Sequence, residues 1–355
     1  MHRPLRILYV GALWHGSTSR QRLKALGHLG HQVVGVDTEP PEVRNASTRL
    51  ISQISRKLFN LGVDAFGPRD LAGANKAIRE KVKAHDWDVL WIDKGLTIEA
   101  QTLAEVKSRN PRCVIVGYSP DDMMGRHNQS RQILGHYPLY DMFFTTKSYG
   151  VGELKSLGCP RVIFVGNAFD PEIHQPVPVS PADRKTWGGP VGFVGAYETA
   201  RAVSLHSLAA HGIHVRVWGP GWHKCRLKSR HLLVEQQSLW AEQYALALNA
   251  FDINLCFLRK LNRDLQTTRS VEIPACGGFM LAERTDEHLA LFEEGKEAEF
   301  FSSDEELLDK VRYYLAHDEN RRRLAAAGRE RCLKSGYSNH ERLQEMLQAI
   351  EQLPG

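Results

Sequence analysis

The stretch INLCFLRKLNRDLQTTRSVEIPACGGFMLA, residues 253–282, contains a complete strand–helix–strand unit. Its apolar start, Ile253–Leu258, is typical of a buried strand, and a helical pattern begins near Thr267. The pair Gly277-Gly278 ends that helix and lets the chain turn tightly into a second apolar strand at Phe279–Ala282. A strand, a helix and a strand in succession form the repeating unit of a parallel sheet that is covered on both faces.

The same alternation extends along the rest of the chain. Further apolar runs predict strands at Leu5–Val10, Gln32–Val36, Asp88–Asp93, Cys113–Tyr118, Asp141–Thr145, Arg161–Val165, Val191–Val194 and His214–Trp218. Helical patterns lie at Ser19–Leu29, Leu71–Ala84, Ile98–Ser108, Thr199–Ala210, Gln236–Asn249 and Ser338–Leu353, and others begin at Glu287, Asp304 and Asn320. The whole chain is therefore predicted to be an α/β protein.

A segment rich in proline and glycine, between Asp170 and Pro190, interrupts the alternation. Such a composition is typical of an interdomain linker, and 355 residues are enough for two domains. We predict two tandem, doubly wound Rossmann-like domains that face a cleft, with a C-terminal helix able to cross back to the first domain. The predicted boundaries are 1–172 for the first domain, 173–190 for the linker, 191–336 for the second domain and 337–355 for the last helix.

The chain is mildly basic, with 46 Lys and Arg against 41 Asp and Glu. It has no basic motif interleaved with aromatic residues, so we predict no nucleic-acid partner. No apolar run reaches the roughly 18 residues of a spanning helix, and we expect a cytoplasmic protein. The basic clusters Arg226–His231 and Arg321–Arg323 are compatible with peripheral docking on the anionic inner face of a membrane, but a solvated surface is the simpler interpretation. The spacing of the six cysteines matches no zinc site, and we expect no metal requirement.

The helix near Thr267 predicts a site for an anion. Its first residues, Thr267 and Thr268, offer free N–H groups that suit a diphosphate. Arg269 and Glu272 share a helix face, where a guanidinium can clamp phosphate oxygens and a carboxylate can accept from ribose hydroxyls. The alternative is an exposed ion pair that contributes only roughly 0.2–0.5 kcal/mol.

Several longer stretches resemble one family. They are TTRSVEIPACGGFMLAERTDEHLALFEEGKEAEFF, VGFVGAYETAR, VWGPGW and YYLAHDENRRRLAAAGRERCL in the second half, and YSPDDMM, YDMFFTTKSYGVGELKSLGC and VGNAFDPEIHQPV in the first. They are similar to CgeB-like glycosyltransferases of the GT-B superfamily, near glycosyltransferase family 4. The resemblance covers roughly residues 85–345 and implies a nucleoside diphosphate sugar as the donor.

The resemblance also implies roles for single residues around the donor. Family 4 has a Glu-x7-Glu motif, which here reads Asp264-x7-Glu272. This implies Asp264 near the donor sugar and Glu272 on the ribose. The aspartate departs from the pattern and has a shorter arm, so a surface residue of the loop is the alternative.

Two further loops belong to the implied donor site. Gly195 would let the backbone approach the diphosphate, Arg201 would neutralise it, and Tyr197 lies between them. Gly219 and Trp222 would lie near the base, on which Trp222 could stack. The alternatives are an ordinary turn at Gly195, a solvated helix face at Arg201 and core or domain-interface packing for Trp222.

The first domain is predicted to bind the acceptor. His15 and Gly16 lie in a loop after the first strand, and this loop is not a G-x-G-x-x-G motif. Asp121 and Asp122 follow the strand at Cys113–Tyr118 and could act as a base or bind a sugar, although a plain turn is the alternative.

We therefore predict a glycosyltransferase of the hexosyltransferase type. It would move a sugar from a nucleoside diphosphate sugar to a hydroxyl of a glycan, lipid-linked or other acceptor, with retention of configuration. The alternatives are a sugar-nucleotide 2-epimerase and a protein without catalysis that binds nucleotide sugars or serves in coat assembly.

Overall fold

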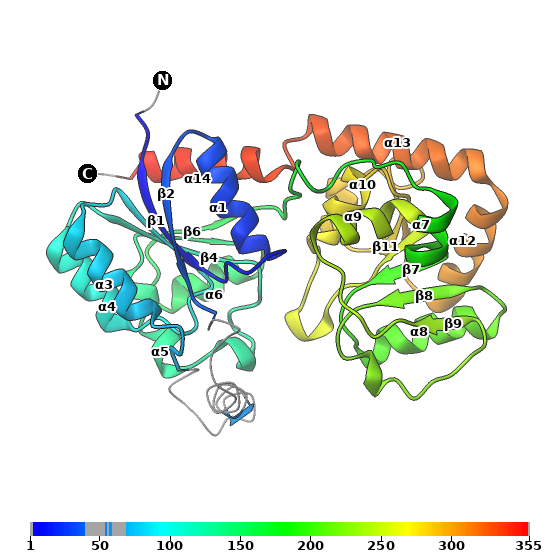
Figure 1. Ribbon diagram of the computed structural model, residues 1–355, viewed down its shortest axis with the longest axis horizontal. Coiled ribbons are helices and arrows are strands. Elements are labelled where there is room, and N and C mark those ends of the chain that lie inside the picture. The colour runs from blue at the N-terminus through cyan, green and yellow to red at the C-terminus, as the bar shows by residue number, and fades with distance from the viewer. Residues whose placement is uncertain (1–2, 40–53, 55–56, 59–68, 354–355) are drawn as a thin grey trace. The chain divides into compact units, whose positions relative to one another are not determined.

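The computed structural model describes residues 3–39, 54, 57–58 and 69–353. The chain forms two compact units, shown in Figure 1. The first unit comprises Met1–Gly166 together with Asn339–Gly355, and the second comprises Asn167–Ser338. None of the helices within the described ranges is both long and apolar enough to cross a membrane.

The first unit is a six-stranded parallel sheet with the strand order β2-β1-β3-β4-β5-β6. Its strands are β1 (Arg6–Gly11), β2 (Gln32–Asp37), β3 (Val89–Asp93), β4 (Val114–Ser119), β5 (Met142–Thr145) and β6 (Val162–Phe164). Its α-helices are α1 (Thr18–His28), α3 (Ala74–Ala84), α4 (Ala100–Arg109), α5 (Arg131–Leu134), α6 (Gly150–Ser156) and α14 (Asn339–Glu351). Short 3₁₀ helices lie at Arg126–Asn128 and Tyr137–Leu139.

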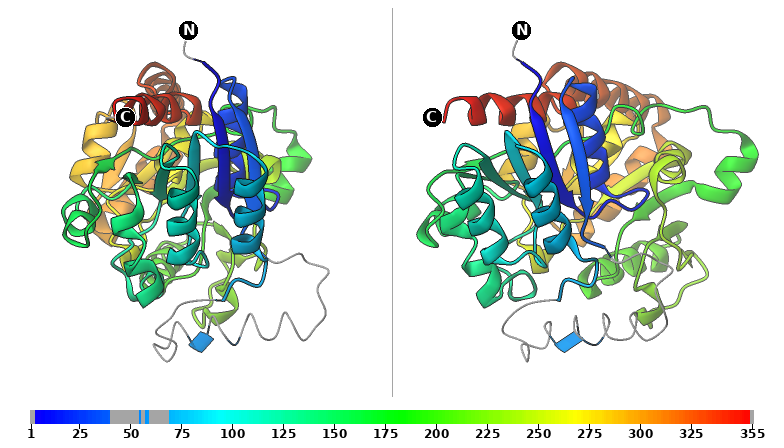
Figure 2. Two further views of the ribbon diagram at one scale, coloured as in Figure 1. Left: turned by 90° about the vertical axis from the view of Figure 1, so that its left-hand side faces the viewer. Right: turned by 60° about the vertical axis from the view of Figure 1, so that its left-hand side comes forward.

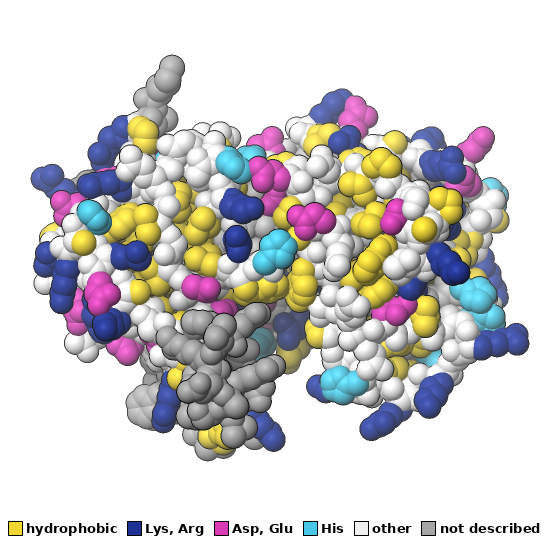
Figure 3. Space-filling model, in the orientation of Figure 1, with side chains coloured by type: hydrophobic (Ala, Val, Ile, Leu, Met, Phe, Trp, Pro, Cys, Tyr) yellow, Lys and Arg dark blue, Asp and Glu magenta, His cyan; other side chains and the backbone are white. Residues whose placement is uncertain are grey.

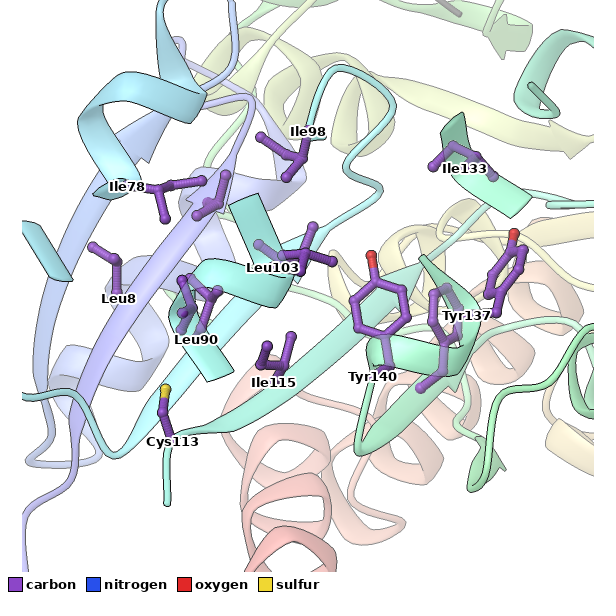
Figure 4. Close-up of a cluster of buried hydrophobic side chains, with 14 of the residues drawn as sticks. Leu8, Ile78, Leu90, Ile98, Leu103, Cys113, Ile115, Ile133, Tyr137 and Tyr140 are labelled. Atoms are coloured by element: carbon purple, nitrogen blue, oxygen red, sulfur yellow. The ribbon is translucent and has the colours of Figure 1, made fainter. Parts of the chain in front are cut away.

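Successive residues of these strands point to opposite faces of the sheet, and both faces are covered by helices. On one face Leu8 and Leu90 pack with Ile78 of α3 and Leu103 of α4, a layer that Figure 4 shows in part. The other face is covered by α1 and α14, whose residues join a second apolar cluster. Figure 2 shows these helix layers from two further directions. The C-terminal helix thus belongs to the first unit.

The second unit repeats this architecture with the strand order β12-β11-β10-β7-β8-β9, again all parallel. Its strands are β7 (Gly189–Val194), β8 (Val215–Trp218), β9 (Leu232–Val234), β10 (Phe251–Cys256), β11 (Met280–Glu283) and β12 (Glu299–Phe301). Its α-helices are α7 (Pro181–Trp187), α8 (Thr199–Ala210), α9 (Ala241–Ala250), α10 (Arg269–Ala275), α11 (Asp286–Leu291), α12 (Asp304–Ala316) and α13 (Asp318–Lys334). Short 3₁₀ helices lie at Trp222–Lys224 and Lys260–Asn262.

The prediction of two parallel α/β sheets is confirmed. The proline-rich segment differs from expectation, because it lies inside the second unit and contains α7. Pro181 occupies the first turn of α7, where its missing N–H costs nothing, and Ser180 and Asp183 form a capping box. The helix expected from Gln236 begins only at Ala241. Gln236 and Ala241 have positive φ angles, which a right-handed helix does not allow, so the helix cannot run through this segment.

Candidate functional site

Two loops at the carboxyl ends of β7 and β8 touch through their glycine backbones. Gly219 has a φ of +145°, and a Cβ atom there would lie 2.0 Å from the carbonyl oxygen of Gly195, an overlap that only glycine avoids. The N–H of Tyr197 donates to the carbonyl of Pro220 at 3.0 Å. The loops form a joint rim at the sheet edge where parallel α/β sheets bind their ligands.

Trp222 supports this rim from within the core. Its side chain is 1% exposed, and its Nε1 donates to the carbonyl of Gly195 at 2.8 Å. Its ring also packs edge-on against Tyr197, with ring centroids 5.4 Å apart. A buried indole has no open face for a base, which argues against the predicted stacking role of Trp222. Of the two aromatic residues, Tyr197 is the half-buried one.

Two arginines, Arg201 of α8 and Arg269 of α10, both lie over the ring of Phe193. Their Cζ atoms are 5.5 Å and 5.7 Å from the ring centroid. Arg201 is 3% exposed, donates through Nη1 to the carbonyl of Ala196 at 3.0 Å, and has Nη2 at 3.9 Å from Glu198. Nε and Nη2 of Arg201 and Nε of Arg269 are buried without a hydrogen-bond partner in the described part of the chain.

These guanidinium groups repel each other. Burial and, next, the charge of Arg269 lower the pKa of Arg201 to about 10, which still leaves it charged at neutral pH. An anion between the two side chains would offset this repulsion and accept their unused N–H groups. The structure therefore brings Gly195, Tyr197, Gly219 and both arginines together in a site with the chemistry of a polyanion receptor.

Glu272 is buried and does not form the exposed ion pair that was the alternative for it. The residue is 5% exposed, and its Oε2 accepts a hydrogen bond from the Tyr244 hydroxyl at 2.7 Å. Its Oε1 lies 3.8 Å from Nε2 of the buried His174. Neither partner was identified from the sequence, because Tyr244 and His174 come from segments distant in the chain and carry no local motif.

The start of α10 differs from the expectation of a helix N-terminal anion site. The helix has seven residues and begins at Arg269, with Thr268 as its N-cap. The N–H of Thr267 already donates to Ser270 Oγ at 3.0 Å. This short helix has a small dipole, and the N–H of Thr267 is not available to a diphosphate. The two arginine side chains add positive charge beside this helix start.

A buried serine–histidine chain fixes this helix start. Ser270 Oγ lies 2.7 Å from Nε2 of His288, and Nδ1 of His288 lies 2.6 Å from the carbonyl oxygen of Glu283. Burial lowers the pKa of His288 to about 4. The neutral ring therefore donates from Nδ1 to the carbonyl and accepts at Nε2 from the serine. Neither Ser270 nor His288 was among the site residues predicted from the sequence.

Asp264 is tied to its own loop. Its Oδ1 accepts from the side chain of Asn262 at 2.7 Å, and its Oδ2 accepts from the N–H of Arg259 at 3.3 Å. The residue is 9% exposed. These contacts hold the turn in which Arg263 has a left-handed φ of +47°. They favour the interpretation of Asp264 as a residue that shapes the loop.

The predicted acceptor residues lie at the corresponding sheet edge of the first unit. His15 is exposed in the turn after β1, beside Gly16, whose φ of +89° requires the left-handed region. Asp121 forms an ion pair with Lys94. Asp122 is 3% exposed and accepts from the N–H of Met124 at 2.9 Å, as a turn-forming aspartate does.

A buried polar cluster at this edge was not predicted. Oδ2 of Asp93 accepts from the Tyr9 hydroxyl at 2.7 Å and from Nη2 of Arg22 at 2.6 Å, and Arg22 lies over the ring of Tyr118 at 4.3 Å. Arg22 and Asp93 are 5% and 7% exposed. The pair joins α1 to β3 across 71 residues, which no sequence spacing reveals.

The described residues contain no group of three or more His, Cys, Asp or Glu side chains arranged to hold a metal ion. Residues 201–348 match the protein family described as "Glycosyl transferase-like". No curated protein sequence shows significant similarity to the chain.

The whole chain resembles several solved structures. It matches a sucrose-phosphate synthase from Thermosynechococcus elongatus with a TM-score of 0.65 and 13% identity, over 99% of both chains. It matches Anabaena HepE in complex with UDP and glucose with a TM-score of 0.65 and 12% identity, over 98% of this chain and 100% of that one. A glycosyltransferase from Rickettsia africae matches with a TM-score of 0.61 and 10% identity, over 99% of both. At these identities the similarity shows the fold alone, two successive doubly wound α/β units of the GT-B type.

Proposed function

We propose that the protein is a glycosyltransferase that moves a sugar from a nucleoside diphosphate sugar to an acceptor hydroxyl. The observation that carries this proposal is the pair Arg201 and Arg269 over Phe193, with buried N–H groups that lack hydrogen-bond partners among the described residues. Two guanidinium groups side by side, with one carboxylate at 3.9 Å from Arg201 and with buried, unused N–H donors, are costly to the apo protein. A diphosphate would supply further negative charge between the two guanidinium groups and acceptor oxygens for their unused N–H groups.

The two arginines also suit the chemistry of transfer. When the glycosidic bond of the donor breaks, negative charge builds on the leaving diphosphate, and fixed donors aimed at that charge lower the barrier. Gly195 and Gly219 leave the rim without side chains beside these donors. The match of residues 201–348 to a glycosyl transferase-like family supports the same reading, as does the structural similarity to HepE, which was solved with UDP and glucose.

The finer assignments are part of this proposal. Glu272 would accept from the ribose hydroxyls, with Oε2 held by Tyr244. Asp264 would act near the donor sugar through the loop that it shapes, and the reaction would retain the configuration of the sugar. The acceptor, a hydroxyl of a glycan or lipid-linked molecule, would be bound by the first unit, where His15, Asp121 and Asp122 are the candidate residues.

One experiment tests the reaction class. The purified protein is incubated with UDP-, GDP-, dTDP- and CMP-sugars, each with and without an acceptor fraction from a cell lysate. We expect release of free nucleotide that depends on the acceptor fraction. Conversion of the sugar nucleotide without release would identify an epimerase instead, and tight binding with neither outcome would identify a protein without catalysis.

A further inference from the structure

The basic charge of this protein is concentrated in one segment. Residues 199–234 contain six Lys and Arg residues, five histidines and no Asp or Glu. The other 319 residues carry 40 Lys and Arg against 41 Asp and Glu, and are therefore close to neutral. A segment of 36 residues without one carboxylate is unusual in a chain with 25% charged residues. The net positive charge of the whole protein comes from this segment.

The segment folds into one edge of the second unit. It comprises α8, β8, the loop that follows β8, and β9, which is the outermost strand of the sheet. Strand β9 pairs with β8, and α8 packs against both strands. In Figure 3, Lys, Arg and His side chains gather at the lower edge of the second unit, where Figure 1 labels α8 and β9. We call this surface, formed by residues 199–234, the basic edge.

Four cations of the basic edge face solvent. Arg201 is buried in the donor site, and Arg216 is paired with Glu235 at 2.5 Å. The remaining four are exposed, and none forms an ion pair with another described residue; they are Lys224, Arg226, Lys228 and Arg230. Because no carboxylate interrupts the segment, their fields add. The basic edge is therefore complementary to a surface of negative charge.

The same edge also exposes aliphatic side chains. Leu227, between Arg226 and Lys228, is 39% exposed, and Leu233 of β9 is 52% exposed. Val203 of α8 is 49% exposed. Cations alone would suit a soluble polyanion, whereas cations mixed with exposed aliphatic groups suit the boundary between lipid headgroups and acyl chains. The combination favours a bilayer as the partner.

We propose that the basic edge binds the protein peripherally to an anionic membrane. The four exposed cations lie near the anionic headgroups, and Leu227 and Leu233 enter the interface. The loop that carries the cations starts at Gly219, against Gly195 of the donor site. Membrane contact and nucleotide binding thus use opposite ends of one loop, and the contact does not depend on the proposed transfer reaction.

The test is flotation of the full chain with phosphatidylcholine vesicles that contain either no anionic lipid or about 30% phosphatidylglycerol, which makes the surface strongly anionic. We expect binding only to the anionic vesicles. This binding should be lost when the salt concentration is raised from roughly 0.05 M to 0.5 M. The variant K224Q/R226Q/K228Q/R230Q should bind at least tenfold more weakly. Leu227→Ser should weaken binding severalfold at unchanged charge.

A matched control removes the same charge elsewhere. Lys76, Lys296, Arg322 and Lys334 are exposed and lie outside the basic edge, and their quadruple replacement by glutamine should leave vesicle binding unchanged. Equal losses in both variants would overturn the proposal, because net charge alone would then explain the binding. Retention of the wild-type protein on heparin without binding to anionic vesicles would also overturn it and identify a soluble polyanion as the partner. Vesicle binding is compared only among variants whose melting temperature equals that of the wild-type protein, which shows that each variant is folded.

Discussion

The hydroxyl of Tyr244 donates a 2.7 Å hydrogen bond to Oε2 of Glu272. Burial and the neighbouring carboxylate raise the pKa of Tyr244 well above its ordinary value, so the hydroxyl keeps its proton and remains a donor. The other oxygen of Glu272 lies 3.8 Å from Nε2 of His174, beyond a normal hydrogen bond. One carboxylate oxygen is thus held in place, while the second has capacity for a ligand.

Removal of this carboxylate should remove nucleotide binding. For Glu272→Ala we expect no thermal stabilisation by the nucleoside diphosphate that best stabilises the wild-type protein, because the proposed ribose contact is lost. Tyr244→Phe should keep the carboxylate but remove the hydrogen bond that positions it. We expect this to weaken nucleotide binding by roughly 1–3 kcal/mol. Thermal shift with ribose and 2′-deoxyribose forms of the nucleotide measures the effect. Full stabilisation of the alanine variant would remove Glu272 from the site.

Replacement of Arg201 should change stability and binding in opposite directions. Arg201→Met keeps the length of the side chain but removes a buried charge that Arg269 repels. We expect the apo protein to unfold at an equal or higher temperature, because the desolvation of this guanidinium and its repulsion by Arg269 are removed. Titration calorimetry should show a loss of about 1.5–3 kcal/mol in diphosphate binding for Arg201→Met and for Arg269→Ala.

The control for both arginine variants is a nucleoside without phosphate. Its affinity should stay unchanged, because the guanidinium groups are proposed to contact only the diphosphate. Loss of nucleoside affinity to the same extent would show that the arginines shape the fold of the rim and do not bind phosphate.

Gly219→Ala should destabilise the rim of the donor site. The added Cβ would lie 2.0 Å from the Gly195 carbonyl oxygen, at a φ of +145° that L-residues rarely adopt. We expect a loss of at least ~2 kcal/mol in the free energy of unfolding, measured in urea. Gly152→Ala is the matched control, since no atom of the described residues lies within 4 Å of a Cβ added there and the residue occupies helix α6. That substitution should be neutral or stabilising by up to ~1 kcal/mol.

The buried His288 should make the second unit sensitive to acid. Its pKa is about 4 in the folded protein, below the ordinary value of 6.5. Between these values the unfolded chain binds a proton that the folded chain does not, so stability falls as the pH drops from about 6.5 to about 4. One such group contributes at most ~1.4 kcal/mol per pH unit.

His288→Gln should flatten this slope in urea denaturation followed from pH 7 to pH 4.5. The exposed His211 provides the comparison, and His211→Gln should leave the slope unchanged. An unaltered pH dependence in the His288 variant would mean that other groups, such as the buried His136, account for the acid sensitivity.

The sequence predicted the local structure well because its signals are local. The apolar runs located ten of the twelve strands in the described part of the chain, and the missed ones, β9 and β12, are short strands that the sequence pattern did not separate from their surroundings. The pair Gly277-Gly278 marked the end of α10 because chain reversal there needs a positive φ, which Gly277 adopts at +75°. The proline-rich segment was predicted to be a linker because prolines often interrupt secondary structure. Proline also favours the first turn of a helix, and Pro181 occupies that position in α7.

The sequence by itself determined two parallel α/β sheets, the residues at their carboxyl edges and Arg201 and Arg269 as candidates for an anion. Only the tertiary structure decided how those side chains are used. It placed Trp222 in the core, held Glu272 with Tyr244, and set both arginines over Phe193. The physical reason is that secondary structure follows from periodicity within a few residues. The desolvation and hydrogen bonds of a site instead depend on partners brought together from distant strands and helices.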